Sequence, residues 1–323
     1  MKKTIYFLSL TVIAVILIAG CTLAKSSSSG SSSTGGGGNG TKQIDYNVMV
    51  SIDGGTYYQT DGANGFNHTI SSFQLGKYEV TYDLWYSVYQ WAILPANGYN
   101  FANAGMEGSV GAIGVAPTSG SNQPVTIVSW RDVMVWCNAY SAKSGLVPCY
   151  TYSSAVIKDA TNATACDNAV CTWTNSGYRL PTEGEWQYAA SNKGTTPYNY
   201  LSGATADYTN DAASFAVAVF YHYNSGNLTG VIKTADVGTK AANALFIFDM
   251  SGNVFEWCWD WYASYPTTAQ TDYRGPASGS TSTRVDRGGS WAGTVNLCQV
   301  SYRNDSNSNY AGYAVGFRVA KAN

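Results

Sequence analysis

The order of strand and helix signals along residues 47–320 most constrains the fold, because strand-like segments stand at both ends with helix starts between them. NVMVSIDGGTYYQTDGANGF (47–66) is typical of two strands joined by a turn, and SFQLGKYEVT (72–81) alternates apolar and polar residues as a strand does. A short apolar strand, GFRVA (316–320), comes last. Strands at both termini with helices packed to one side predict an α+β domain whose ends lie together.

Three helix starts carry residues that cap a first turn. Thr81 can accept a hydrogen bond from a free backbone amide of the helix that follows it. Ser129 with Asp132, and Thr182 with Glu185, have the three-residue spacing of a capping box, in which each side chain satisfies a free amide of the first turn. We therefore predict helices that begin just after residues 81, 129 and 182.

The N-terminus has the pattern of an export signal. Lys2 and Lys3 precede an apolar run that is too short to span a bilayer comfortably, and small residues stand just before Cys21. This pattern resembles the lipobox of bacterial lipoproteins, which implies that residues 1–20 are removed and that Cys21 is acylated. The alternative is a plain signal peptide with an incidental cysteine. We expect an exported lipoprotein of the outer membrane or cell surface, held to the membrane by its lipid, on a side that the sequence leaves open.

Residues 21–42 consist of that cysteine and a Ser- and Gly-rich stretch that contains almost nothing able to bury surface, which predicts a flexible tether. No second low-complexity linker follows, so residues 43–323 are expected to form a single domain. Charged residues make up only 12% of the chain and its net charge is −2, which excludes a nucleic-acid-binding role. The 25 Tyr and 10 Trp are rings that suit both a core and an interface.

Six cysteines follow Cys21, and an even number in an exported protein suggests disulfides of undetermined connectivity. They are Cys137, Cys149, Cys166, Cys171, Cys258 and Cys298. Cys166 and Cys171 stand close together in a polar loop and are the expected local pair. For Cys137, a simple buried residue on a helix is the equal alternative.

Six short segments resemble, in this order, the motifs of the formylglycine-generating-enzyme type of domain, an elaborated variant of the C-type lectin fold. They are KYEVT (77–81), QPVTIVSWRDV (123–133), YRLPTEGEWQYAA (178–190), FDMSGNVFEWCWDW (248–261), RGGSW (287–291) and GFRVA (316–320). The resemblance spans residues 48–320 and implies an α+β C-type lectin fold of the formylglycine-generating-enzyme (sulfatase-modifying factor) subtype. Fold alone does not give function.

The catalytic residues that the family implies are missing. Its enzymes use a pair of cysteines shortly after the GGS motif to bind copper, whereas residues 292–297 contain no cysteine and only Cys298 is near. Relatives that hold a ferrous ion use three histidines, and this chain has only His68 and His222. We therefore expect no catalysis. The alternative is an exported copper- or iron-dependent oxidase, or a sulfatase-maturation-like enzyme, that uses Cys258 and Cys298.

One metal site of the family is represented. The GNVFEW stretch resembles a calcium-binding turn, and the resemblance assigns oxygen ligands to Asn253, Val254 and Glu256. In the alternative, Asn253 caps the turn and Glu256 pairs with an arginine such as Arg287. No cofactor is required, and structural calcium is the candidate.

The C-terminal segment has a narrower resemblance. RGGSW, then C-x-V-S-x-R-N, a polar run and GFR-V-A are similar to the variable region of proteins diversified by retroelements that mutate adenines, of the kind found among spirochaete lipoproteins. This resemblance implies a variable region at about 284–323. Adenine mutation of AAC codons never yields Lys, Glu, Met or Trp, and none of these four occurs from Ala292 to Val315.

The resemblance and the composition together predict a diversified binding site at about 292–315. Tyr, Ser, Gly and Asn suit an adaptable contact surface, because rings give contact area at small entropic cost and small polar residues adapt their hydrogen bonds. The expected ligand-facing residues are Ala292, Gly293, Thr294, Leu297, Tyr302, Asp305, Ser306, Tyr310, Ala311, Gly312 and Tyr313. A protein ligand is expected, with its identity open.

Overall fold

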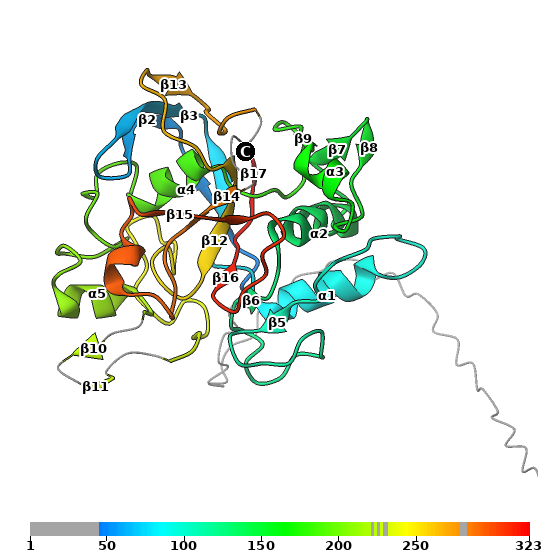
Figure 1. The fold of residues 1–323 in the computed structure, drawn as a ribbon, viewed down its shortest axis with the longest axis horizontal. Coiled ribbons are helices and arrows are strands. Elements are labelled where there is room, and N and C mark those ends of the chain that lie inside the picture. Colours follow the sequence, from blue (N-terminus) through cyan, green and yellow to red (C-terminus); the bar gives the residue numbers. More distant parts are fainter. Residues whose placement is uncertain (1–44, 221–222, 225–226, 229–231, 278–282) are drawn as a thin grey trace, which may run out of the picture. The chain divides into compact units, whose positions relative to one another are not determined.

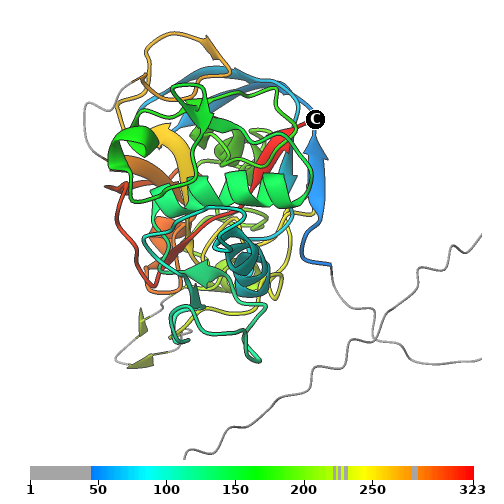
Figure 2. The ribbon, with the colours of Figure 1, turned by 90° about the vertical axis from the view of Figure 1, so that its right-hand side faces the viewer.

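The two ends of the domain meet in one small antiparallel sheet. β1 (Met49–Ile52) and β17 (Ala320–Ala322) pair with opposite edges of β4 (Phe73–Gly76), so that Leu75 lies opposite both Val50 and Ala320. In Figure 2, β17 in red lies beside the blue N-terminal strands. The prediction that the ends of the domain lie together is thereby confirmed.

This computed structural model describes residues 45–220, 223–224, 227–228, 232–277 and 283–323. Residues 44–323 form one compact unit. The predicted signal peptide, the lipidation site Cys21, the tether and His222 lie outside the described residues. None of the helices in the described ranges is long and apolar enough to cross a membrane.

All three predicted helix starts are correct. Thr81 accepts a hydrogen bond from the amide of Leu84 at the start of α1 (Tyr82–Ala92). Ser129 with Asp132, and Thr182 with Glu185, form complete capping boxes at α2 (Trp130–Lys143) and α4 (Glu183–Ala190). A box satisfies two backbone amides that the helix itself cannot, which explains why the local sequence is enough to fix these starts.

The central sheet has the strand order β15-β14-β12-β16 (Figure 1). Its strands are β12 (Phe255–Trp261), β14 (Thr283–Arg287), β15 (Arg303–Asn307) and β16 (Val315–Gly316). β15 and β14 run antiparallel to their neighbours, while β16 runs parallel to β12. The predicted strand GFRVA is divided between β16 and β17, with 317–319 between them.

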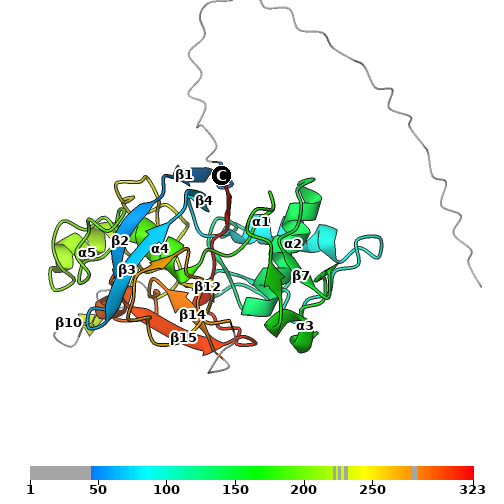
Figure 3. The same ribbon diagram turned by 90° about the horizontal axis from the view of Figure 1, so that it is seen from above.

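Helices cover the central sheet on both sides, which corrects the prediction that they pack to one side. Figures 1 and 3 show α1 and α2 on one side and α4 on the other. Successive residues of a strand point to opposite faces. Trp257 belongs to the apolar cluster of α1 and α2, and the next residue, Cys258, belongs to the cluster of α4. Since β12 is apolar on both faces, each face needs a helical cover.

The remaining elements are peripheral. The hairpin of β2 (Gly55–Thr60) and β3 (Gly65–Ile70) extends to β13 (Gln270–Thr271) in a three-stranded sheet. The other elements are β5 (Met106–Glu107), β6 (Val125–Thr126), β7 (Tyr150–Tyr152), β8 (Ala155–Val156), α3 (Ala163–Asp167), β9 (Val170–Cys171), α5 (Asp211–Val217), β10 (Tyr223–Asn224), β11 (Asn227–Leu228) and the 3-10 turn η1 (Val295–Cys298).

The six cysteines of the domain are buried free thiols in this structure. The predicted pair of Cys166 and Cys171 is not formed, and the Cys166 thiol donates to the carbonyl of Asp159 at 3.4 Å. The Cys171 thiol instead shares a hydrogen bond with Cys149, the residue just before β7, to which β9 is paired. Strand pairing, which spacing in the sequence could not reveal, decides which thiols meet.

Candidate ligand-binding surface

The segment between β14 and β16 is fastened at its start by Arg287 at the end of β14. This fully buried guanidinium donates to the carbonyls of Val300 at 2.8 Å and Ser301 at 3.0 Å, and also to that of Tyr302. Gly289 follows with a φ of +74°, and a Cβ there would lie 2.6 Å from the Cys298 sulfur. Only glycine fits this approach without strain.

Arg303, the first residue of β15, fastens the middle of the segment to α4. Its guanidinium binds the Glu183 carboxylate in a bidentate manner, at 2.5 and 2.7 Å, and donates to the carbonyl of Ala263 at 2.9 Å. Although burial opposes it, the charges of Arg303 and Arg287 hold the pKa of Glu183 below its usual value. Such a planar, charge-assisted pair fixes direction as well as distance.

Arg318 fastens the far end. Its guanidinium makes two bonds of 2.6 Å to the Glu256 carboxylate and donates to the carbonyls of Gly76 and Phe248. Trp186 of α4 donates its indole N–H to the same carboxylate at 2.8 Å. The three arginines therefore join the segment to β4, β12 and α4, on rigid parts of the fold.

Shorter contacts hold the intervening backbone. Asn304 donates to the Asp286 carboxyl at 2.7 Å, and burial raises the pKa of Asp286 to about 7. The carbonyl of Cys298 accepts from Ser251 at 2.7 Å, and Ser308 donates to Asp167 at 3.1 Å. Strand β15 is thus an edge strand whose position is set by contacts of residues that are not in the predicted ligand-facing set.

Most of the predicted ligand-facing residues reach the surface. Ala292, Thr294, Asp305, Tyr310 and Tyr313 are exposed, and Gly293, Leu297, Tyr302, Ser306 and Ala311 are half-buried. Leu297 and Tyr302 also pack against the apolar core, so part of each side chain is structural. Tyr310 and Tyr313 are the largest exposed side chains of the group, at 47% and 55% of their full accessibility.

Gly312 does not belong to the surface set. It is buried, and its carbonyl accepts a hydrogen bond from the amide of Ile127 at 3.1 Å. A Cβ at this position would lie 2.3 Å from the Tyr310 hydroxyl oxygen. Its role is to let the chain pass close to β6 while Tyr310 and Tyr313 point outward on either side, so the prediction for this residue is corrected.

The residues predicted to bind calcium are engaged by protein groups. Both Glu256 oxygens bind Arg318, which agrees with the alternative of an arginine partner, although that arginine is not Arg287. Asn253 donates to Glu79 at 2.6 Å, and its side-chain oxygen accepts from the amide of Ala235 at 3.0 Å. In this arrangement the side-chain oxygens of Asn253 and Glu256 do not fit a calcium ion, which needs them as free ligands. Val254 offers its amide to Glu79.

The alternative enzyme would use Cys258 and Cys298, which lie in different apolar clusters. Burial raises the pKa of Cys298 to about 12 and that of Cys258 well above its usual value, so neither thiol readily forms the thiolate that binds metal. Among the described residues, no three His, Cys, Asp or Glu side chains are grouped to hold a metal ion. His68 is buried between Gln59 and the amide of Tyr273.

The sequence did not indicate Glu183 as an anchor of the variable segment, and it gave Glu256 only as a calcium ligand or as the partner of an arginine. Both acids stand in segments rich in aromatic residues, PTEGEW and VFEWCWDW. Such neighbours tend to be buried, and a carboxylate that is buried with them needs a cation as its partner. That requirement was a usable signal for an arginine partner. The sequence did not say which arginine, because the partners stand far along the chain.

Comparison with known proteins agrees with this architecture. Residues 38–323 match the family described as Sulfatase-modifying factor enzyme 1-like domain, and the chain belongs to this family. It has the C-type-lectin-like α+β fold of the formylglycine-generating-enzyme type, as predicted.

Particular relatives can be named. Treponema denticola variable protein 1 is a solved structure with a TM-score of 0.66 and 28% identity, covering 85% of this chain and 95% of that chain. Chaperone protein LppX of Paenibacillus barcinonensis is 33% identical over 291 residues, 85% of this chain and 89% of the relative. The formylglycine-generating enzyme of Streptomyces coelicolor is 32% identical over 154 residues, 45% of this chain and 47% of that enzyme. The predicted resemblance to variable proteins is thus supported by a structural match.

Proposed function

We propose that this protein is an exported, lipid-anchored receptor whose residues 292–315 form a diversified surface for a protein ligand, and that it carries out no bond chemistry. The observation that carries the proposal is that anchoring residues and exposed residues are different residues of the segment. Arg287, Arg303 and Arg318 are tied to buried acids and backbone carbonyls, while Tyr310 and Tyr313 project into solvent between them. Side chains at the exposed positions can change without disturbing these anchors.

The chemistry of the exposed positions suits contact with another protein. Tyrosine rings bring large area with few rotatable bonds, and the small polar residues around them adapt to different partners. The likeness to Treponema denticola variable protein 1 supports the proposal that this chain is also a variable protein. The buried, unfavourably ionised thiols of Cys258 and Cys298 argue against the oxidase alternative.

Sequencing the gene and its surroundings in several isolates tests the proposal. Differences should fall on codons for exposed positions such as Thr294, Asp305 and Tyr310, at adenines of a nearby template copy. Codons for the anchors Arg287 and Arg318 should not change. Differences spread evenly along residues 43–323 would contradict diversification. Stoichiometric copper or iron in the purified protein, with oxygen uptake on thiol peptides, would favour the enzyme instead.

A further inference from the structure

A pocket of 510 Å³ lies beside the variable segment, on a part of the surface that the proposed function does not use. It is lined by the end of α3 and the start of β9, by β12, by the loop that follows β13, and by the start of β14. The lining residues that matter to the argument are Trp173, Trp259, Trp261, Arg274, Arg284 and Asp167.

Arg284 is the unusual member of this lining. Its side chain is only 2% exposed, and its guanidinium carbon lies 3.6 Å from the ring centre of Trp130 and 3.4 Å from that of Trp261. One nitrogen donates to the carbonyl of Trp259 at 2.7 Å, while Nε has no hydrogen-bond partner. No carboxylate in the described part of the chain forms an ion pair with it.

A buried cation without a counter-charge is costly, and indole faces compensate only part of that cost. Burial lowers the pKa of Arg284 to about 9, despite the opposing pull of Asp167 and Asp260. The other buried arginines near the variable segment each have a carboxylate: Arg303 and Arg318 bind theirs in a bidentate manner, and Arg287 lies 3.8 Å from that of Glu183. Arg284 is therefore the one among these whose partner is absent from the described chain.

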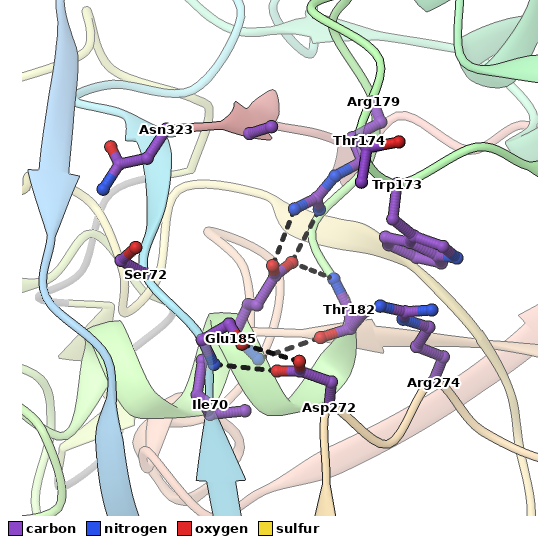
Figure 4. A pocket seen from close by; sticks show the side chains of 12 residues that line it. Ile70, Ser72, Trp173, Thr174, Arg179, Thr182, Glu185, Asp272, Arg274 and Asn323 are labelled. Atoms are coloured by element: carbon purple, nitrogen blue, oxygen red, sulfur yellow. Dashed lines mark hydrogen bonds and ion pairs between the residues drawn. The ribbon is translucent and has the colours of Figure 1, made fainter.

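The neighbouring pocket in Figure 4 shows the contrasting case. It measures 320 Å³, and within it Arg179 binds Glu185 through two bonds of 2.7 Å, while Asp272 accepts from Ser71. The charges there are satisfied by the protein. Arg274 lines both pockets, stacks on Trp173 at 4.2 Å and is exposed, so that its charge remains available to a ligand.

The wall carrying Arg274 is held in place. Gly275 has a φ of +78°, and a Cβ there would lie 3.0 Å from that of Asp260, which shows how closely the loop lies against β12. Asp167 on the opposite wall is neutralised by Arg131, 2.6 Å away. The pocket therefore combines half-buried indole rings with an excess of positive charge.

We propose that this pocket binds a carboxylated sugar residue, with its carboxylate held by Arg284 and Arg274 and its ring against the indole of Trp261. A carboxylate supplies the negative charge that Arg284 and Arg274 both lack among the described residues. Indole faces present the apolar surface that a sugar's C–H face can cover, and guanidinium groups suit planar carboxylates. The site needs no calcium.

The pocket adjoins the variable segment. Ser306 lies directly opposite Arg284 in the pairing of β14 with β15, and Ser308 donates to Asp167. The lining itself lies outside residues 292–315. A ligand bound in this pocket would keep its contacts with the lining residues while the side chains of residues 292–315 change. The inference does not depend on the proposed function.

Calorimetric titration of the full chain in detergent tests the site. The probes are methyl glycosides of glucuronate, galacturonate and N-acetylneuraminate, with methyl glucoside and methyl galactoside as neutral controls. At least one acidic glycoside should bind saturably and at least tenfold more tightly than the neutral sugars. Arg274→Gln should weaken that binding at least fivefold, and Arg284→Gln more. Lys193→Gln, outside the pocket lining, should leave it unchanged.

Three further arms separate the sources of the signal. N-acetylglycinate supplies a carboxylate without a sugar ring, and inorganic phosphate supplies an anion of another class. If either binds as tightly as the acidic glycosides, the assignment to a carboxylated sugar is wrong. It is also wrong if no acidic glycoside binds, or if Arg274→Gln, which is exposed and should fold, has no effect. Replacing Tyr310 and Tyr313 together by Ser should preserve glycoside affinity, which separates this site from the variable surface.

Discussion

Individual buried charges in this domain determine where the variable segment can lie. Arg287, Arg303 and Arg318 each make several bonds, and each ends on a different part of the scaffold. The exposed rings of Tyr310 and Tyr313 make no comparable bonds to the described part of the scaffold. At the residue scale, therefore, tolerance to change follows from the contacts of each side chain, and it can be tested one position at a time.

His68 should make stability depend on acidity. Burial lowers its pKa to about 4, against an opposing influence of Asp272, Glu185 and Glu183. Its two ring nitrogens contact Gln59 and the amide of Tyr273, which suits the neutral ring. The folded pKa lies below the unfolded value of about 6.5, so the unfolded state binds the extra proton first as the pH falls.

The contribution of His68 to stability is therefore complete above about pH 6.5 and is lost as the pH falls toward 4, by up to about 3 kcal/mol. Denaturant unfolding of the parent and His68→Gln proteins between pH 4 and 8 measures it. The difference between the two curves should shrink toward low pH. A difference that is constant over this range would show that the ring titrates alike in both states.

Glu256 should be required for folding rather than for binding. Glu256→Gln leaves the fully buried Arg318 without its carboxylate while keeping an acceptor for Trp186. Breaking a buried pair from one side costs about 3–5 kcal/mol. Chemical denaturation measures the loss. Asp53→Asn, which removes the exposed partner of Lys193, is the matched control and should produce no measurable change. Equal effects of the two substitutions would refute the structural role.

At this scale the sequence predicted residue types better than partners. The capping residues Thr81, Ser129 and Thr182 act within one turn, so their local spacing was sufficient. For Glu256 the sequence left calcium and an arginine partner open, and the partner is Arg318 rather than Arg287 because β16 lies beside β12. Partners brought together by sheet topology have no signature in sequence spacing.

Among the elements, β12 explains an error of sequence interpretation. Its residues Trp257, Trp259 and Trp261 alternate along the strand. The assumption of one covered face failed because Trp257 and Cys258 are both buried, on opposite faces. A strand that is apolar throughout requires cover on both sides, and that rule would have placed the helices correctly.

The β7–β9 pair should be the first place where thiols oxidise. The hydrogen bond from Cys171 lowers the pKa of Cys149 and holds the two sulfurs in contact, so this pair can close as soon as local opening admits the oxidant. With glutathione disulfide as oxidant, the two thiols lose two protons and two electrons, and the glutathione disulfide is reduced to two glutathione molecules. Non-reducing peptide mapping should find Cys149 linked to Cys171 before any other pair. A first link between Cys166 and Cys171 would contradict the strand pairing.

The turn after β15 should tolerate side-chain exchange where the turn after β14 does not. Replacing both Tyr310 and Tyr313 by Ser removes exposed rings and should lower stability by less than about 1 kcal/mol. Gly289→Ala should cost at least about 1–3 kcal/mol, because its φ of +74° is unfavourable and its Cβ would press on Cys298 and on the carbonyl of Leu297. Thermal unfolding compares them, and the opposite order would overturn the assignment of scaffold and surface.

The whole domain combines a scaffold whose two ends pair in one sheet with a single segment, residues 292–315, whose exposed side chains can change. β1 and β17 close the domain through β4, and Arg318 binds the carbonyl of Gly76 at the end of the same strand. The C-terminal framework is therefore part of the structure that joins both ends. This arrangement explains how residues 292–315 can vary in side chain and still have an ordered backbone. The residues on either side of them are bound to the sheets that join both ends of the domain.

If the domain is closed in this way, its stability should not depend on the N-terminal tether. The Ser- and Gly-rich residues 22–42 offer almost no apolar side chains to bury, so removing them takes little from the folded state. A chain that begins at Gln43 should unfold within about 2 °C of the full chain when both are heated in the same detergent. A deletion that stops at residue 52 would remove β1 from the edge of β4 and should lower the midpoint by more than about 5 °C. If the first deletion were as harmful as the second, the tether would have to contribute contacts to the domain, and residues 43–323 would not be a self-sufficient unit.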